Sequence, residues 1–474
     1  MNNFKLHFLN HTSFLIEHNE WLLLLDPWPS LSTSFDGWVS NPPCFMNEEL
    51  LAAFINSYAM DNKKNFAILV SHGHDDHCDD NFLKKISPDV NFFIPKYNSP
   101  GVKRRIGALG FENIHEIPSS SNSSSQFGPF KLTASLTNFT ADYADDNAIV
   151  GIFTDDYSFI HANDCSIPFP KPLLDELKSN MDRTKIKYFA SQTNRANCWP
   201  HQYPQIKDSL SKYEFDNLVT NSIRKTIQSA INNAHHLNSE FFISYGGYTA
   251  ALPLLNQNPS LTQFFPSPEN IKSLQLDYHD VTLSEAIPGD TIDTMSSVVQ
   301  KPFWNRLSSL EKTSKKFLEG KKKRPEKVLP DKYYDENMMP DDVLITSLEE
   351  YMEKFNNFLL KSFDNVLPED VNEKIFRITI EDIGESVSLV LGKGCVKQGE
   401  KNERIPTKEM IIDLAGARAL VIGRMNFESF YVGFNGSFKR NPIDVHNKVL
   451  IGHLQKFAYI YQKRLVPDSL KKLI

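Results

Sequence analysis

Residues 66–77 read Phe66-Ala-Ile-Leu-Val-Ser-His-Gly-His-Asp-Asp-His77, a short apolar run that ends in a polar cluster. Four potential metal ligands arrive within six positions: His72, His74, Asp76 and His77. Alternate side chains of an extended segment share one face, so His72 and His74 point the same way. A tight turn then directs Asp76 and His77 toward a second point nearby. These residue types at one strand end predict a site for two adjacent divalent cations, which can activate a bridging water or O₂.

The segments before this motif add two further polar positions. Phe8–Glu17 contains His11, and the buried run Trp21-Leu-Leu-Leu-Leu-Asp-Pro-Trp28 ends at Asp26. Together with the pattern His-x-His-x-Asp-His, they resemble the metallo-β-lactamase fold. The resemblance implies an α/β protein with a four-layer αββα sandwich, in which His11 and Asp26 lie beneath the metals and orient the ligands.

Composition limits the classes of protein to which the chain can belong. It has 474 residues, 41% of them hydrophobic, so two globular domains are expected. Its net charge is −7, so there is no excess of basic residues that would indicate binding to nucleic acid. The apolar runs are too short to cross a membrane, and the first residues lack the core of a signal peptide. The cysteines are scattered and odd in number, which favours reduced thiols in a cytoplasmic protein. They are Cys44, Cys78, Cys165, Cys198 and Cys395. We therefore expect a small-molecule substrate, no nucleic acid and no membrane.

Three segments follow along the chain. Residues 1–300 form the predicted catalytic domain, 301–340 a charged, helical linker, and 341–474 a smaller α+β domain. Apolar spacing predicts helices over 47–58, 171–190 and 205–238, and a buried strand over 240–245.

The C-terminal segment has the pattern of a sheet with helices. A helix is expected over 343–360, antiparallel strands over 376–380, 387–391 and 409–414, and a short helix over 417–423. The stretches Gly423-Arg-Met-Asn-Phe-Glu-Ser-Phe430 and Lys439-Arg-Asn-Pro442 resemble the sterol-carrier-like domain. That resemblance implies an apolar tunnel; a lid or a homodimer surface fits the pattern equally.

A two-metal site needs further ligands. Asp164 ends the apolar strand Ser158-Phe-Ile-His-Ala-Asn-Asp164, where the family has its bridging aspartate, while His161 lies opposite in the pleat and is expected to be packed rather than ligating. The family usually has another histidine in the loop before the preceding strand, and here Asp142 occupies the corresponding place. If Asp142 is a ligand, the added oxygen donor favours iron or manganese over zinc. His201 is the candidate for the closing ligand, with a surface-loop histidine as the alternative.

A narrower resemblance points to oxygen chemistry. Asp26-Pro-Trp28 and Ser34-Phe-Asp-Gly-Trp-Val-Ser-Asn-Pro42 are similar to the CMP-N-acetylneuraminate hydroxylases, over about residues 5–260. Those enzymes hydroxylate a sugar nucleotide with iron and with electrons passed through a Rieske cluster. This chain has no pair of Cys-x-His motifs for such a cluster, so its electrons would come from a separate electron-transfer protein.

Two reactions fit these patterns. The favoured one is an O₂-dependent hydroxylation of a small polar metabolite, such as a sugar nucleotide, by two irons, with zinc or manganese as other options. His72, His74 and Asp142 would hold one metal, and Asp76, His77 and His201 the other, with Asp164 bridging. Trp28, Trp38, Trp199 and Tyr203 would form an aromatic entrance that shields the oxidant. For a nucleotide phosphate the nearby cations are Arg104, Arg105 and Arg195.

The alternative is hydrolysis of a phosphoester, lactone or amide by a metal-bound hydroxide, with Asp76 as ligand and proton acceptor. Asp76 and Asp164 are the catalytic candidates in both cases. A degenerate binding protein is the third option, and the intact four-ligand cluster disfavours it.

Overall fold

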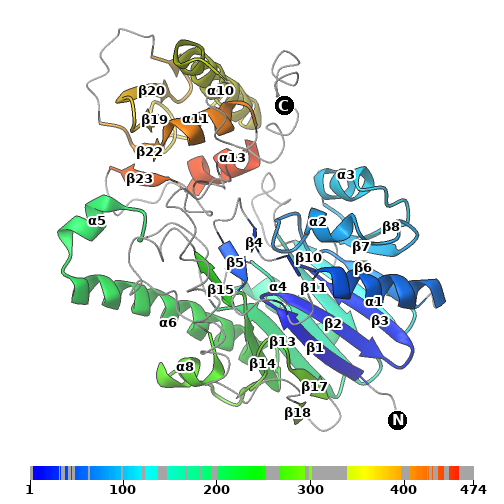
Figure 1. The fold of residues 1–474 in the computed structure, drawn as a ribbon. Coiled ribbons are helices and arrows are strands. Elements are labelled where there is room, and N and C mark those ends of the chain that lie inside the picture. Colours follow the sequence, from blue (N-terminus) through cyan, green and yellow to red (C-terminus); the bar gives the residue numbers. More distant parts are fainter. Residues whose placement is uncertain are drawn as a thin grey trace.

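Two large sheets carry most of the N-terminal part of the computed structural model (Figure 1). The structure describes residues 4–30, 32–33, 38–40, 44, 48–61, 65–97, 100–119, 123–136, 147–165, 168–181, 183–193, 200–251, 266–293, 298–300, 339–396, 405–423, 425, 427, 430, 436–441 and 448–457.

The first sheet has eight strands in the order β18-β17-β1-β2-β3-β6-β7-β8. Its strands are β1 (Phe4–Asn10), β2 (Ser13–His18), β3 (Trp21–Leu25), β6 (Phe66–Leu69), β7 (Asn91–Pro95), β8 (Ile114–Ile117), β17 (Thr291–Asp293) and β18 (Val298–Gln300). The strands from β3 to β8 run parallel, whereas β1, β2 and β3 form an antiparallel meander. The tip of the β1–β2 hairpin therefore lies beside the carboxyl ends of β3 and β6.

The second sheet has seven strands in the order β16-β14-β13-β12-β11-β10-β9. They are β9 (Ser125–Phe127), β10 (Phe130–Leu136), β11 (Ala148–Phe153), β12 (Tyr157–His161), β13 (Ile186–Gln192), β14 (Phe241–Tyr245) and β16 (Thr282–Leu283). The strands β12, β13, β14 and β16 are parallel. A small third sheet joins β4 (Ser32–Thr33), β5 (Trp38–Ser40) and β15 (Thr249–Ala251).

The leucines of β3 show how the layers form. Leu23 and Leu25 pack between the two sheets, whereas Leu22 and Leu24 pack on the opposite face, in the cluster that includes Ile55 of a covering helix. A strand whose two faces are both buried needs a continuous apolar run, because alternate side chains point to opposite sides. The run at 21–25 is thus the sequence of an inner strand of a layered sandwich.

Helices cover the outer face of each sheet. The first sheet carries α1 (Glu48–Asp61), α2 (Asp80–Leu83) and α3 (Gly101–Ala108). The second carries α4 (Lys171–Met181), α6 (Lys212–His236) and α8 (Pro268–Ser273), and α5 (Pro204–Ser209) precedes α6. The predicted four-layer αββα sandwich is confirmed. The predicted helix 171–190 was too long, because it ends at Met181 and Ile186 already begins β13.

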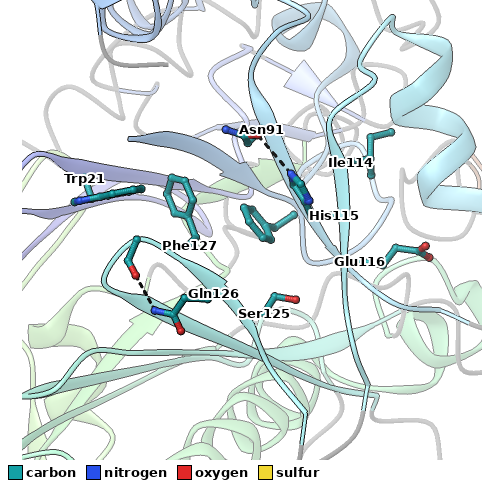
Figure 2. A pocket seen from close by; sticks show the side chains of 10 residues that line it. Trp21, Asn91, Ile114, His115, Glu116, Ser125, Gln126 and Phe127 are labelled. Atoms are coloured by element: carbon teal, nitrogen blue, oxygen red, sulfur yellow. Dashed lines mark hydrogen bonds between the residues drawn. The ribbon is translucent and has the colours of Figure 1, made fainter. Parts of the chain in front are cut away.

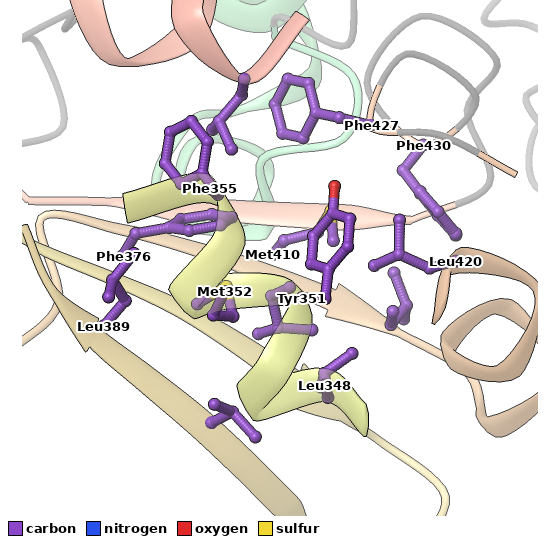
Figure 3. Close-up of a cluster of buried hydrophobic side chains, with 14 of the residues drawn as sticks. Leu348, Tyr351, Met352, Phe355, Phe376, Leu389, Met410, Leu420, Phe427 and Phe430 are labelled. Atoms are coloured by element: carbon purple, nitrogen blue, oxygen red, sulfur yellow. The ribbon is translucent and has the colours of Figure 1, made fainter. Parts of the chain in front are cut away.

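Residues from 339 onward form their own five-stranded sheet, in the order β21-β20-β19-β22-β23. Its strands are β19 (Ile375–Ile380), β20 (Glu385–Val390), β21 (Gly394–Cys395), β22 (Lys408–Ile412) and β23 (Ser437–Arg440), with helices α10 (Asp341–Ser362), α11 (Leu414–Val421) and α13 (Lys448–Phe457). The sheet is mixed rather than antiparallel as predicted, since β19 and β22 pair in parallel. Figure 3 shows α10 placing Leu348, Met352 and Phe355 against the sheet.

The C-terminal unit shares its hydrophobic core with the N-terminal part. Tyr203, Ile206 and Phe215 belong to the same buried cluster as α10 and its sheet, and Phe438 N donates to Gln202 O at 2.9 Å. Residues 202–215, which include α5 and the start of α6, therefore join the two units. The predicted linker lies outside the described residues up to 338, and the sterol-carrier-like resemblance stays a prediction. None of the described helices is long and apolar enough to cross a bilayer.

Candidate metal centre

Side chains from four chain segments meet at the carboxyl ends of the parallel strands. After β6, a turn in which Cys78 N donates to His74 O at 2.8 Å reverses the chain before α2. Asp79 ends this turn by capping α2, accepting from the backbone N–H groups of Asn81 and Phe82. The turn is what brings the second half of the His-x-His-x-Asp-His motif back toward the first half.

Asp26 is the centre of the hydrogen-bond network under this turn. It is fully buried, and its Oδ1 accepts from Ser71 N at 2.6 Å. Its Oδ2 lies 2.6 Å from Ser71 Oγ, 2.7 Å from His77 Nδ1 and 2.7 Å from His161 Nε2. One carboxylate thus ties the loop after β3 to the loop after β6 and to the end of β12.

The network also fixes which nitrogen of each histidine can bind a metal. A carboxylate only accepts, so His77 carries its hydrogen on Nδ1 and presents the Nε2 lone pair to a cation. Ser71 Oγ donates to Asp26 and can accept from His72 Nδ1, which lies 3.0 Å away. The Nε2 atom of His72 is therefore also directed to the metal side. His77 Nε2 is buried with no hydrogen-bond partner, as expected for a ligand atom.

Apart from Asp26, His77 and His161 of the buried network, the possible ligand atoms form two overlapping groups. His72, His77 and Asp164 make the first, with Asp164 Oδ2 at 3.9 Å from His72 Nε2 and 3.5 Å from His77 Nε2. His74 Nδ1 is 3.8 Å from the same oxygen and 2.8 Å from His72 Nε2. Two donors about 2.1 Å from one tetrahedral cation stand roughly 3.4 Å apart. The spacing therefore fits a shared divalent ion.

The second group consists of His11, Asp76 and His77. Asp76 Oδ2 lies 3.3 Å from His11 Nε2 and 3.9 Å from His77 Nε2. His11 comes from the tip of the β1–β2 hairpin, where its φ of 36° is unusual for a residue other than glycine. Asp26 and Asn163, next to Asp164, have positive φ as well, so three loops of the site hold sparsely populated conformations.

The charges of the cluster favour a cation. Burial alone would lower the pKa of His77, but the carboxylates of Asp164, Asp26 and Asp76 outweigh it and raise that pKa to about 10. Burial and the neighbouring His77 and His74 hold the pKa of His72 well below its usual value, so His72 is neutral. Burial would raise the pKa of Asp164, yet His77 and His74 keep it well below its usual range. His77 is therefore protonated in the metal-free chain, and a cation that binds there would displace the proton on Nε2. With that proton gone, the centre combines ionised carboxylates with imidazole lone pairs, the donor set of a zinc, iron or manganese site.

The structure brings most of the predicted ligands together. His72, His74, Asp76, His77 and Asp164 lie in one cluster. Asp142 lies outside the described residues. His201 is elsewhere: its ring packs on Phe215 at 5.4 Å, and burial lowers its pKa to about 4. It belongs to none of the ligand groups among the described residues.

The predicted aromatic entrance has a different role. Trp28 and Trp38 are buried. The rings of Trp28 and His11 make an edge-to-face contact, with their centroids 5.3 Å apart. Tyr203 lies in the core shared with the C-terminal unit, where its hydroxyl accepts from Lys408. Trp199 lies outside the described residues. The described aromatic side chains are therefore buried in the protein, and of them Trp28 contacts a residue of the centre.

Sequence reasoning missed two contributions. His11 was expected only as a support, whereas its Nε2 stands among possible ligand atoms. His161 was expected to be packed rather than ligating, and it is buried, but its hydrogen bond to the Asp26 carboxylate was not foreseen. The contact between His161 and Asp26 depends on how β12 is placed in the sandwich relative to the loop after β3. No local sequence pattern indicates that these two residues meet.

A separate groove lies at the open edge of the sandwich, between β8 and β9 (Figure 2). Its volume is about 680 Å³, and Trp21, Phe93 and Phe127 form its apolar wall, with His115 stacked on Phe93 at 5.0 Å. None of the predicted ligands is among its described lining residues. It is therefore distinct from the metal cluster.

A family model matches the part of the chain that carries the cluster. The family model described as the beta-lactamase superfamily domain matches residues 5–179. No curated relative matches the chain.

Solved structures resemble it distantly. They include Igni18, a metallo hydrolase from the archaeon Ignicoccus hospitalis (14% identity, TM-score 0.37, 63% of this chain and 99% of that one). CmlA, a diiron beta-hydroxylase from Streptomyces venezuelae, is another (15%, 0.35, 52% and 44%). A third is an isothiocyanate hydrolase from Delia radicum gut bacteria (12%, 0.39, 60% and 98%). Similarity this low decides nothing about the reaction. The family model covers residues 5–179, and the strand-end cluster lies within this range, so this part of the chain is similar to the beta-lactamase superfamily domain.

Proposed function

We propose that this chain is a binuclear metal-dependent enzyme that hydrolyses a small polar substrate, a phosphoester, lactone or amide. The observation that carries the proposal is the set of donor atoms at the strand ends: imidazoles of His11, His72, His74 and His77, with carboxylates of Asp76 and Asp164. Two divalent cations held there would supply Lewis-acid activation of water at neutral pH.

The donor set reverses the order of the two reactions expected from sequence. The sequence-based preference for iron and O₂ depended on Asp142 being a metal ligand, where it would put a carboxylate in the place of a histidine. The described donors are four imidazoles and two carboxylates, and His11 supplies a histidine from another part of the chain. Nitrogen-rich sites of this kind suit zinc and hydrolysis.

The chain's own groups would divide the work. Asp26 holds His77 directly and His72 through Ser71 Oγ, so both imidazoles keep their Nε2 atoms toward the metals. Asp164 Oδ2 stands 3.5 Å from Nε2 of His77, the residue that both ligand groups share, and would bridge the cations. Asp76 is partly exposed and stands 3.3 Å from His11 Nε2, so it is placed to accept a proton from the attacking water.

O₂-dependent hydroxylation is the second candidate. The observation that favours it is the buried Trp28, which packs on His11 and keeps bulk water from that side of the centre. In this case iron or manganese would replace zinc, and a separate protein would supply electrons. A sugar nucleotide is the substrate that the sequence resemblance suggests for this reaction.

One experiment separates the two candidates. The full chain is loaded in parallel with Zn²⁺ and with Fe²⁺, and each form is assayed with chromogenic phosphodiester, lactone and amide substrates and for reductant-dependent O₂ consumption. Hydrolysis by the zinc form that is lost in His72→Ala and Asp164→Ala supports the proposal. O₂ consumption by the iron form, with no hydrolysis, supports the second candidate. Activity retained in both variants would place the reaction elsewhere.

A further inference from the structure

Arg105 makes an unusual set of contacts from helix α3. Its Nε donates to Asp80 Oδ1 at 2.7 Å. Its Nη2 donates to Asp75 Oδ1 and to Cys78 O, each at 2.8 Å. Its Nη1 donates to Gly73 O. The side chain is only 10% exposed, although the carboxylate of Asp75 is itself half exposed. One guanidinium therefore spans a loop of eight residues.

The four contacts alternate with the proposed ligands. Arg105 holds residues 73, 75, 78 and 80, and the ligands occupy positions 72, 74, 76 and 77. A loop held at these points has few ways to move one ligand relative to another. None of the four bonds touches a ligand atom, so the effect of Arg105 on the metals is indirect.

We propose that Arg105 is a positioning residue that fixes the ligand loop in its metal-binding shape. The inference rests on the metal centre of the proposed function. It replaces the expectation that Arg105 meets a substrate phosphate, because four of its five N–H donors already bond within the loop. The geometry also explains the four aspartates of 75–80. Asp76 faces the metals, Asp79 caps α2 and accepts from Ser30 N, and Asp75 and Asp80 anchor the guanidinium.

The contacts require an arginine. Donors at Nε, Nη1 and Nη2 reach acceptors on three sides of a planar group, and two of the acceptors are backbone carbonyls. A lysine presents one ammonium at the end of a flexible chain and cannot reproduce this fork. Lys103 offers a matched control on the same helix, since its Nζ pairs with Glu116 at 2.7 Å at the surface, away from the loop.

The test compares metal-free full-length Arg105→Met, Arg105→Lys and Lys103→Met with the wild type. The apparent Kd for Zn²⁺ is measured by competition with a chromogenic chelator, and the visible spectrum of the Co²⁺ form reports the ligand geometry. Loss of a group that orients metal ligands typically weakens metal binding by about 10- to 100-fold. We expect the apparent Kd for Zn²⁺ to rise by this factor in Arg105→Met and the Co²⁺ spectrum to change. Arg105→Lys should show most of the same rise in Kd. Lys103→Met should keep both the wild-type Kd and the wild-type spectrum.

The outcomes separate the inference from the function on which it rests. If the wild type binds no pair of cations, the metal centre itself is wrong. If the wild type binds them and Arg105→Met has the Kd and spectrum of Lys103→Met, the positioning role is wrong. If Arg105→Met does not fold without metal, Arg105→Lys decides, and a wild-type Kd in that variant overturns the role.

Discussion

His77 Nδ1 lies 2.7 Å from Asp26 Oδ2, and both side chains are fully buried. Fifty-one positions separate the two residues, so the contact joins the carboxyl ends of two parallel strands rather than neighbours in sequence. It sets the orientation and the tautomer of a proposed metal ligand. The same carboxylate reaches His161 and Ser71, so a change at Asp26 affects several parts of the centre at once.

Replacing Asp26 by asparagine should impair both folding and metal binding. The amide keeps the shape of the carboxylate but loses its charge and directs N–H groups at donors. We expect the free energy of unfolding of the metal-free protein to fall by about 3–5 kcal/mol, as when one partner of a buried ion pair is removed. Zn²⁺ affinity should fall by roughly 10- to 100-fold.

Asp280→Asn is the matched control for this change. Asp280 pairs with His235 Nδ1 at 2.6 Å, but at the surface. Surface changes of this kind usually alter the free energy of unfolding by no more than about 0.5 kcal/mol. Chemical denaturation and Zn²⁺ competition measure both variants. Equal effects in the two would show that burial of the Asp26 network has no special importance.

The stability of the metal-free protein should depend on pH through His77. Its pKa is about 10 in the folded chain, against about 6.5 when unfolded. A raised folded pKa contributes stability that is fully present below about pH 6.5 and is lost as the pH rises through 10. Denaturation at pH 6.5 and 9.5 should show a decrease on the order of 4 kcal/mol. His77→Gln should remove this decrease, and an equally steep loss in that variant would assign it to another group.

His11→Ala tests whether the hairpin tip supplies a ligand. Since His11 Nε2 stands 3.3 Å from Asp76 Oδ2, its removal should weaken the cation bound with Asp76 and His77 and spare the one bound with His72. Isothermal titration should then show one tight and one weakened site. His115→Ala, at an exposed histidine in the groove, is the control. Two sites of wild-type affinity in His11→Ala would return His11 to a supporting role.

Asp142→Ala tests the carboxylate-rich site expected from sequence. If Asp142 is a ligand, the variant should lose one metal per chain while its circular dichroism spectrum stays unchanged. Metal analysis after gel filtration measures the loss. Unchanged occupancy would remove the main physical reason for preferring iron.

The sandwich could be predicted because its signals are local. Apolar runs such as 21–25 and 66–70 have the pattern of strands buried on both faces, and the compact motif at 72–77 carries most of the proposed donors. The ends of helices and strands were harder to predict. The helix predicted over 171–190 ends at Met181, and β13 begins soon afterwards at Ile186 with similar apolar residues, so the pattern runs on across the boundary.

The rest of the centre depends on distant contacts. His161 hydrogen-bonds Asp26, and Arg105 holds the ligand loop. Both contacts follow from the order of strands and helices in the fold and not from the spacing of residues in the sequence. His201 shows the converse: its position in a loop suggested a closing ligand, but the neighbouring Tyr203 packs into the core of the C-terminal unit and takes the segment with it.

The number of divalent cations bound per chain tests the central claim most directly. Equilibrium dialysis of the full chain against Zn²⁺, followed by elemental analysis, should give two ions per chain for the wild type and at most one for Asp164→Ala, which loses the carboxylate proposed to bridge the two cations. A wild-type chain that binds no zinc, or an Asp164→Ala chain that still binds two ions as tightly, would contradict it.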